Sequence, residues 1–121
     1  MNPFIAVFIG GGLGSVSRFG LSKLITSDFQ HINPLATLLS NIFSTVILGL
    51  LLYLSASRFP LGNTARILVI VGFCGGFSTF STFSYETIEL IRSGNMSMAL
   101  INIGLSLVLG IGGLFVLAKS V

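Results

Sequence analysis

The run between positions 77 and 84 combines phenylalanine and hydroxyl side chains at regular spacing. Phe77, Phe80 and Phe83 are three residues apart, and serine or threonine fills each place between them. Hydroxyl groups donate hydrogen bonds, and the edge of a phenylalanine ring carries a positive partial charge. Both features suit a small anion, whereas a helix side that only contacts lipid needs no hydroxyls. The run indicates a polar path, although packing alone also accounts for a phenylalanine stripe.

The composition places the chain in a membrane. Of its 121 residues, 53% are hydrophobic and 7% are charged, whereas a soluble domain has about 25% charged residues. The six basic residues are scattered, which excludes a nucleic-acid footprint. Cys74 and His31 are the only residues of their types, so no Cys/His zinc cluster is expected. The sequence predicts an integral membrane protein that is not an enzyme.

Four apolar stretches are long enough to cross a bilayer as helices, which takes about 20 residues. Short connections with turn residues separate them, and this pattern predicts an up-down-up-down bundle. We expect one all-α transmembrane domain over residues 1–121. The expected spans are 4–25, 35–56, 65–91 and 96–118, with turns near 27–28, 33–34, 58–63 and 93–95.

Glycines are concentrated in the first and third predicted spans. Gly10 and Gly14 form one small-xxx-small pair, and Gly72 and Gly76 form another, which predicts close helix packing. Gly75 and Gly76 also have poor helix propensity, so we expect them to break the third helix near mid-membrane. Broken backbone at that depth must be buried or line a cavity. Its carbonyl oxygens would suit a hard cation such as Na⁺.

Two charged residues lie within predicted spans. Arg18 is two-thirds of the way along the first span, where an arginine is a functional candidate by default. It either extends to the interface, serves an anion vestibule, or pairs with a carboxylate or with freed carbonyls. Glu86 follows the hydroxyl run and either caps, pairs with a basic residue such as Arg18, or titrates.

Uncharged polar residues repeat every fourth position in two spans. Thr37 and Asn41 share one helix face in the second span, and Asn102 and Ser106 share one in the fourth. An asparagine in hydrocarbon needs partners. Asn41 either bonds to another helix or presents its NH₂ donors to an anion.

The basic residues of the connections are almost balanced between the two sides of the membrane. A weak bias leaves orientation unspecified, which favours insertion in both orientations and an antiparallel homodimer. One side has Arg58, Arg66 and Lys119, and the other has Lys23 and Arg92, with Arg18 if it extends there.

The polar residues favour a small anion as the solute. The spans contain no ring of acids for a cation channel. There is no tryptophan and there are two tyrosines, too few for an aromatic cage around an organic cation. Donors without a full positive charge would bind a small anion yet release it.

Three segments together resemble the Fluc (CrcB) family of fluoride ion channels. Residues 72–86 resemble the family signature, residues 10–18 its first-helix motif and residues 34–41 its second-helix motif. The resemblance implies a dual-topology antiparallel homodimer with two fluoride pores in the cell membrane. Members of this family export fluoride passively and lower the cytoplasmic fluoride concentration.

The resemblance also implies roles for particular residues. Ser78 stands where the family usually has threonine, and Ala36 where it has glycine. A structural Na⁺ on the two-fold axis would be held by the backbone carbonyls of Gly75 and Ser78. The implied pore residues are Asn41, Phe80 and Phe83, with the polar track Ser81, Thr82 and Ser106, the neighbouring Thr37 and Glu86, and Arg18 in the vestibule.

Two other functions remain as alternatives. A small dual-topology antiporter would exchange protons for organic cations through Glu86, but such a protein would be expected to place its acid in the first span. A membrane assembly factor would need only the glycine pairs, and it leaves the serine-threonine-phenylalanine run unexplained.

Overall fold

The computed structural model describes residues 1–25, 34–57 and 62–118, and these residues form four helices long and apolar enough to cross a membrane. The prediction of four apolar helices is confirmed. The predicted turns at 27–28 and 58–61, with Asn33, lie outside the described residues. The elements are α1 (Pro3–Ile25), α2 (Pro34–Ser57), α3 (Asn63–Arg66), η1 (Ile67–Cys74), α4 (Gly75–Phe77), α5 (Phe80–Arg92), α6 (Met96–Leu107), η2 (Val108–Gly112) and α7 (Gly113–Ala118).

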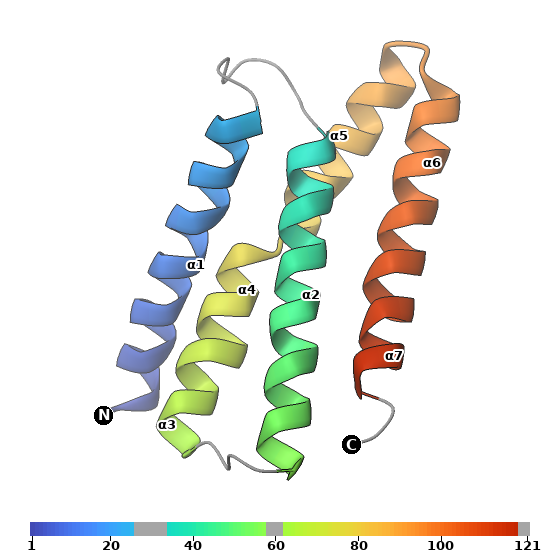
Figure 1. Cartoon of the computed structure of the whole chain (residues 1–121). Coiled ribbons are helices and arrows are strands. Elements are labelled where there is room, and N and C mark those ends of the chain that lie inside the picture. Colours follow the sequence, from blue (N-terminus) through green and yellow to red (C-terminus); the bar gives the residue numbers. More distant parts are fainter. Residues whose placement is uncertain (26–33, 58–61, 119–121) are drawn as a thin grey trace.

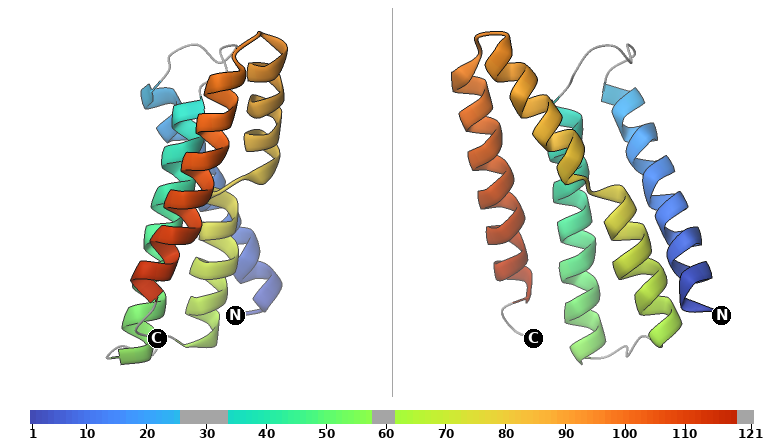
Figure 2. Two further views of the ribbon diagram at one scale, coloured as in Figure 1. Left: turned by 90° about the vertical axis from the view of Figure 1, so that its right-hand side faces the viewer. Right: turned by 180° about the vertical axis from the view of Figure 1, so that it is seen from behind.

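Successive long helices run in opposite directions, and α2 lies between the others (Figure 1). The first half of the third span, η1 and α4, packs against α1. The second half, α5, leans away from α1 and packs against α6, while α7 packs against α2 (Figure 2). The third span therefore has different neighbours on its two halves, and α2 contacts both.

The described bundle buries polar and small side chains and exposes large apolar ones. Phe4 and Leu24 are each 85% exposed. Such a distribution suits lipid, because hydrocarbon solvates apolar side chains while polar groups must find partners inside the bundle. The buried polar residues are Thr37, Ser40, Ser44, Glu86, Thr87 and Asn102.

The two predicted glycine pairs pack against each other where α1 crosses the third span. A Cβ atom added at Gly10 would overlap the Leu68 carbonyl oxygen, and one added at Gly76 would overlap the Gly11 carbonyl oxygen. A Cβ at Gly72 would lie 2.9 Å from the Cα of Gly10. The two backbones thus approach more closely than any side chain permits, as the sequence predicts.

We expect Gly10→Ala to destabilise the protein. The added methyl group would push α1 away from the η1 backbone, which cannot rotate aside, and overpacking of this kind costs about 1–3 kcal/mol. Gly12→Ala on the same helix is the matched control, because a Cβ there meets nothing within 4 Å. Thermal unfolding in detergent measures the difference. Equal unfolding temperatures for the two variants would contradict the packing.

The third span is interrupted, but not at its glycines. Gly75 is helical, with φ −65° and ψ −37°. Ser78 (φ −90°, ψ 153°) and Thr79 (φ −151°, ψ 125°) are extended, and they separate α4 from α5. The prediction that the glycines break the helix is wrong, because packing of Gly76 on Gly11 holds that turn helical. The interruption, Ser78–Thr79, lies two residues later.

Candidate functional site

Side-chain acceptors hold the interruption in place. The Thr79 amide donates to Asn41 Oδ1 of α2 at 2.9 Å. The hydroxyl of Thr79 accepts from the Thr82 amide at 3.3 Å and so caps the start of α5. Each bond replaces one that a continuous helix would have made within its own backbone.

These two bonds free two particular carbonyl groups. In an unbroken helix the Thr79 amide would bond to the Gly75 carbonyl and the Thr82 amide to the Ser78 carbonyl. Both amides are directed to side chains instead. The carbonyl of Cys74 differs, because it accepts from the Ser78 amide at 3.0 Å and from the hydroxyls of Ser44 and Ser78 at 3.0 and 2.8 Å.

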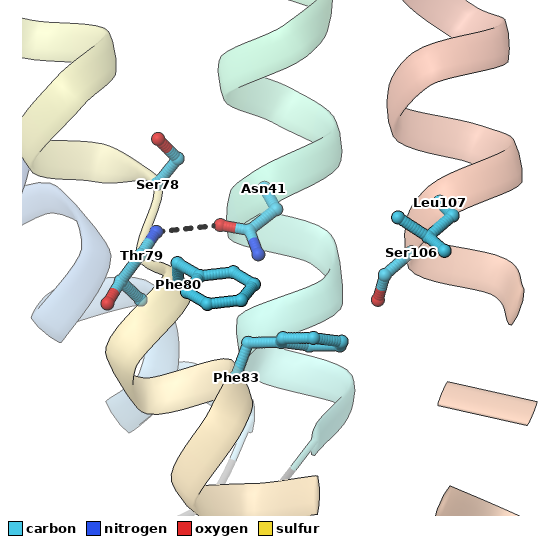
Figure 3. Close-up of a pocket in the computed structure, with 7 residues that line it drawn as sticks. All are labelled: Asn41, Ser78, Thr79, Phe80, Phe83, Ser106 and Leu107. Carbon is cyan, nitrogen blue, oxygen red and sulfur yellow. Dashed lines mark hydrogen bonds between the residues drawn. The ribbon is translucent and has the colours of Figure 1, made fainter. Parts of the chain in front are cut away.

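A pocket of about 250 Å³ opens beside the interruption (Figure 3). It brings together residues from α2, the interruption, α5 and α6, which are far apart in the sequence. Four of its members are residues that the sequence nominates for the pore. The lining residues are Asn41, Ser78, Thr79, Phe80, Phe83, Ser106 and Leu107; we call this the Asn41 pocket.

The hydrogen bond to Thr79 fixes the orientation of the Asn41 amide. Because the backbone N–H is a donor, the atom of Asn41 that meets it must be the oxygen. The NH₂ group of Asn41 then points toward the rings of Phe80 and Phe83 (Figure 3). Asn41 therefore bonds through its oxygen to the interruption of the third span, and its NH₂ group is directed toward the pocket.

Two aromatic rings and the Ser106 hydroxyl also line the Asn41 pocket. The ring centroids of Phe80 and Phe83 are 5.8 Å apart with planes at 37°, a tilted arrangement rather than a face-to-face stack. The rings extend from α5 toward α6, where Ser106 lies (Figure 3). The oxygen of Ser106 is buried and has no hydrogen-bond partner among the described residues. Ser106 is one of the residues that line the Asn41 pocket.

Thr37 and Glu86 meet one turn beyond the pocket. The Thr37 hydroxyl donates to Glu86 Oε1, and the two residues are 8% and 4% exposed. The sequence left Glu86 to cap, to pair with a basic residue such as Arg18, or to titrate, whereas the partner found among the described residues is the Thr37 hydroxyl of α2. Neither residue lines the Asn41 pocket.

The remaining nominated residues lie outside the pocket in the single chain. The Thr79 hydroxyl is 3.2 Å from that of Ser81 and 3.3 Å from that of Thr82, which makes a small hydroxyl cluster at the start of α5. Gly75 is exposed. Arg18 is partly buried, and its Nε has no partner in the described part of the chain.

Two lining residues were not nominated from the sequence. Thr79 directly precedes a helix, and a threonine in that place is a known start signal. That signal could have located the interruption. Leu107 carries no comparable signal, since it is one of many leucines in an apolar span.

The arrangement defines a class of protein: a multi-pass helical membrane protein with an uncharged, donor-rich pocket at an interrupted helix. Within the described residues no group of three or more His, Cys, Asp or Glu side chains could hold a metal ion. Amide and hydroxyl donors with ring edges suit a small anion that must be released again.

The family follows from comparison with known proteins. The model of the family described as "CrcB-like protein, Camphor Resistance (CrcB)" matches residues 5–118. The chain belongs to this family. It is 41% identical over 107 residues to "Fluoride-specific ion channel FluC" of Serratia proteamaculans, covering 88% of this chain and 84% of that protein. A protein of the same name from Pyrococcus abyssi is 42% identical over 105 residues, covering 85% and 82%. These relatives are ion channels rather than enzymes, as predicted for this chain.

Proposed function

We propose that this protein is a fluoride-selective channel of the cell membrane that passively exports fluoride and lowers its cytoplasmic concentration. The observation that carries the proposal is the Asn41 pocket, where amide and hydroxyl donors and two ring edges converge without a full positive charge. The names of the relatives, fluoride-specific channels, support the choice of fluoride among small anions.

The pocket residues would replace the water around the ion. The NH₂ group of Asn41 and the free hydroxyl of Ser106 donate hydrogen bonds, and the edges of Phe80 and Phe83 add positive partial charge. Without a countercharge the ion binds weakly enough to leave. By family resemblance Ser81, Thr82, Thr37 and Glu86 continue the path, and Arg18 serves its vestibule.

We further propose an antiparallel dual-topology homodimer with two pores. A single chain leaves Phe80 78% exposed at the pocket and leaves open space around Gly75, so a second copy would complete the wall. The interruption would then lie near mid-membrane, covered by protein as broken backbone requires. Two of the basic residues that suggested balanced topology, Arg58 and Lys119, lie outside the described residues.

A Na⁺ ion at the two-fold axis is also part of the proposal. The residues fit such an ion. The Gly75 carbonyl lacks its helical partner because the Thr79 amide bonds to Asn41. The Ser78 carbonyl lacks its partner because the Thr82 amide bonds to the Thr79 hydroxyl. Carbonyl oxygens are ligands for such a hard cation. When bound, the ion would supply a fixed positive charge between the two copies.

Removing sodium tests this site. We expect a higher unfolding temperature in sodium chloride than in choline chloride of equal ionic strength, because a ligand that binds only the folded state stabilises it. Potassium chloride serves as the control for cation size. Equal unfolding temperatures in sodium and choline would contradict the site.

Ion efflux from liposomes tests the function itself. The purified protein is reconstituted in vesicles loaded with fluoride or chloride, and an ion-selective electrode follows release. We expect rapid fluoride loss that needs no proton gradient, and no chloride loss. Folded protein without fluoride flux would sink the proposal. Flux that depends on a proton gradient would favour the antiporter alternative, in which Glu86 titrates.

Cysteine labelling tests the dual topology. In a Cys74→Ser background, Asn63→Cys and Ser93→Cys place one thiol at each end of the third span, at residues that are exposed. Each should react with a membrane-impermeant maleimide from both sides of the membrane. Labelling of each from one side only would refute insertion in two orientations.

A further inference from the structure

A buried hydrogen-bond chain outside the Asn41 pocket joins α5 to α6. Asn102 Nδ2 donates to Thr87 Oγ1 at 3.4 Å, and that hydroxyl donates to the Phe83 carbonyl at 2.7 Å. Thr87 and Asn102 are 8% and 7% exposed. A threonine has one hydroxyl proton. Since Thr87 gives its proton to Phe83, it must accept from Asn102, and the direction of the chain is fixed.

Asn102 does not contribute to the Asn41 pocket. It lies on a separate pocket of about 160 Å³ whose other described lining residues are apolar. Asn102 and Ser106 are four positions apart on α6, and Phe83 and Thr87 are four positions apart on α5, which is about one turn on each helix. The hydrogen bond is therefore one turn from the pair that faces each other across the Asn41 pocket.

The interruption separates the position of α5 from that of α4. Because Ser78 and Thr79 are extended, the position and direction of α4 do not determine those of α5. The place of α5 must be set by its own contacts. Glu86 bonds to Thr37 of α2, and the next residue, Thr87, bonds to Asn102 of α6. Neighbouring residues thus tie α5 to two helices.

We propose that Asn102 is a positioning residue for ion conduction: through Thr87 it fixes α5 against α6 and so holds the Phe83 ring across the pocket from Ser106. It acts without touching the ion. This inference rests on the proposed channel function. Asn102 therefore supports the helices that line the ion path and does not itself line the path.

A double-mutant cycle on fluoride efflux tests the proposal. Asn102→Leu and Thr87→Val each remove the bond, and each should slow efflux about threefold, the effect of an average hydrogen bond inside a membrane protein. The double variant should be no slower than either single one. Thr87→Ser keeps the hydroxyl and should conduct like the wild type. Thr64→Val at the exposed Thr64 of α3 is the matched control.

Unfolding temperatures of the same variants give a readout that needs no flux. The two single variants should shift the unfolding temperature, and the double variant should shift it by less than their sum. Slow efflux in Asn102→Leu with normal efflux in Thr87→Val would overturn the proposal, because Asn102 would then act on the ion. Additive effects on both readouts would overturn the pairing. Absence of fluoride flux in the wild type would instead refute the channel function.

Discussion

Asn41→Asp should reduce fluoride efflux about a hundredfold or more while leaving the fold intact. The carboxylate can still accept the Thr79 amide that Asn41 accepts at 2.9 Å, so the interruption keeps its anchor. It has lost both NH₂ donors, and its negative charge faces the anion. Two like charges 4 Å apart repel by about 4 kcal/mol at the effective dielectric constant of a partly exposed site. Efflux from liposomes measures the loss.

Asn41→Leu separates the two tasks of this residue. Leucine removes the donors and also leaves the Thr79 amide without its acceptor, so both efflux and stability should fall. An unmet buried donor costs about 1–3 kcal/mol. Asn63→Asp, at an exposed helix start, controls for added negative charge. Efflux through Asn41→Asp within about threefold of wild type would show that its NH₂ group does not meet the ion.

Phe80→Ile should reduce efflux about two- to tenfold. Isoleucine keeps much of the apolar bulk but has no ring edge, and aromatic interactions of this kind are worth about 0.5–1.5 kcal/mol each. Phe80 is 78% exposed in the single chain, so its ring contributes little to packing within that chain. The loss should therefore appear in efflux, because packing within each chain changes little.

Phe4→Ile is the matched control for Phe80→Ile. Phe4 is 85% exposed on α1 and does not line the Asn41 pocket, so its replacement should leave efflux unchanged. Phe80→Ala tests bulk separately from the ring. Normal efflux in Phe80→Ile together with slow efflux in Phe80→Ala would mean that size, and not the ring edge, matters at this position.

The sequence predicted which residues form the candidate site, but it did not predict which of them line the pocket and which bond to a neighbouring helix. Asn41, Phe80, Phe83 and Ser106 were nominated together and meet in one pocket. Asn102 shares a helix face with Ser106, yet it bonds to Thr87 and faces an apolar pocket. Spacing of four residues places side chains on one face, but the direction of each depends on how the neighbouring helix leans.

The place of the interruption is the clearest difference between sequence and structure. Glycine propensity pointed to Gly75 and Gly76, and propensity is a local property that tertiary contacts override. Packing of Gly76 against Gly11 keeps that turn helical. The break occurs where Asn41, 38 positions away in the chain, accepts the amide of Thr79. No window of sequence around Thr79 contains that partner.

The sequence by itself determined the membrane class, the four helices, the glycine crossing and the family, because these depend on composition, length and local spacing. Tertiary structure alone decided that the Thr79 amide bonds to α2 instead of to its own helix. Asn41 of α2 accepts the Thr79 amide, and the Thr79 hydroxyl, which is local, accepts the Thr82 amide. The carbonyls that they release belong to Gly75 and Ser78, and the amide group that they orient faces the pocket of Phe80 and Phe83.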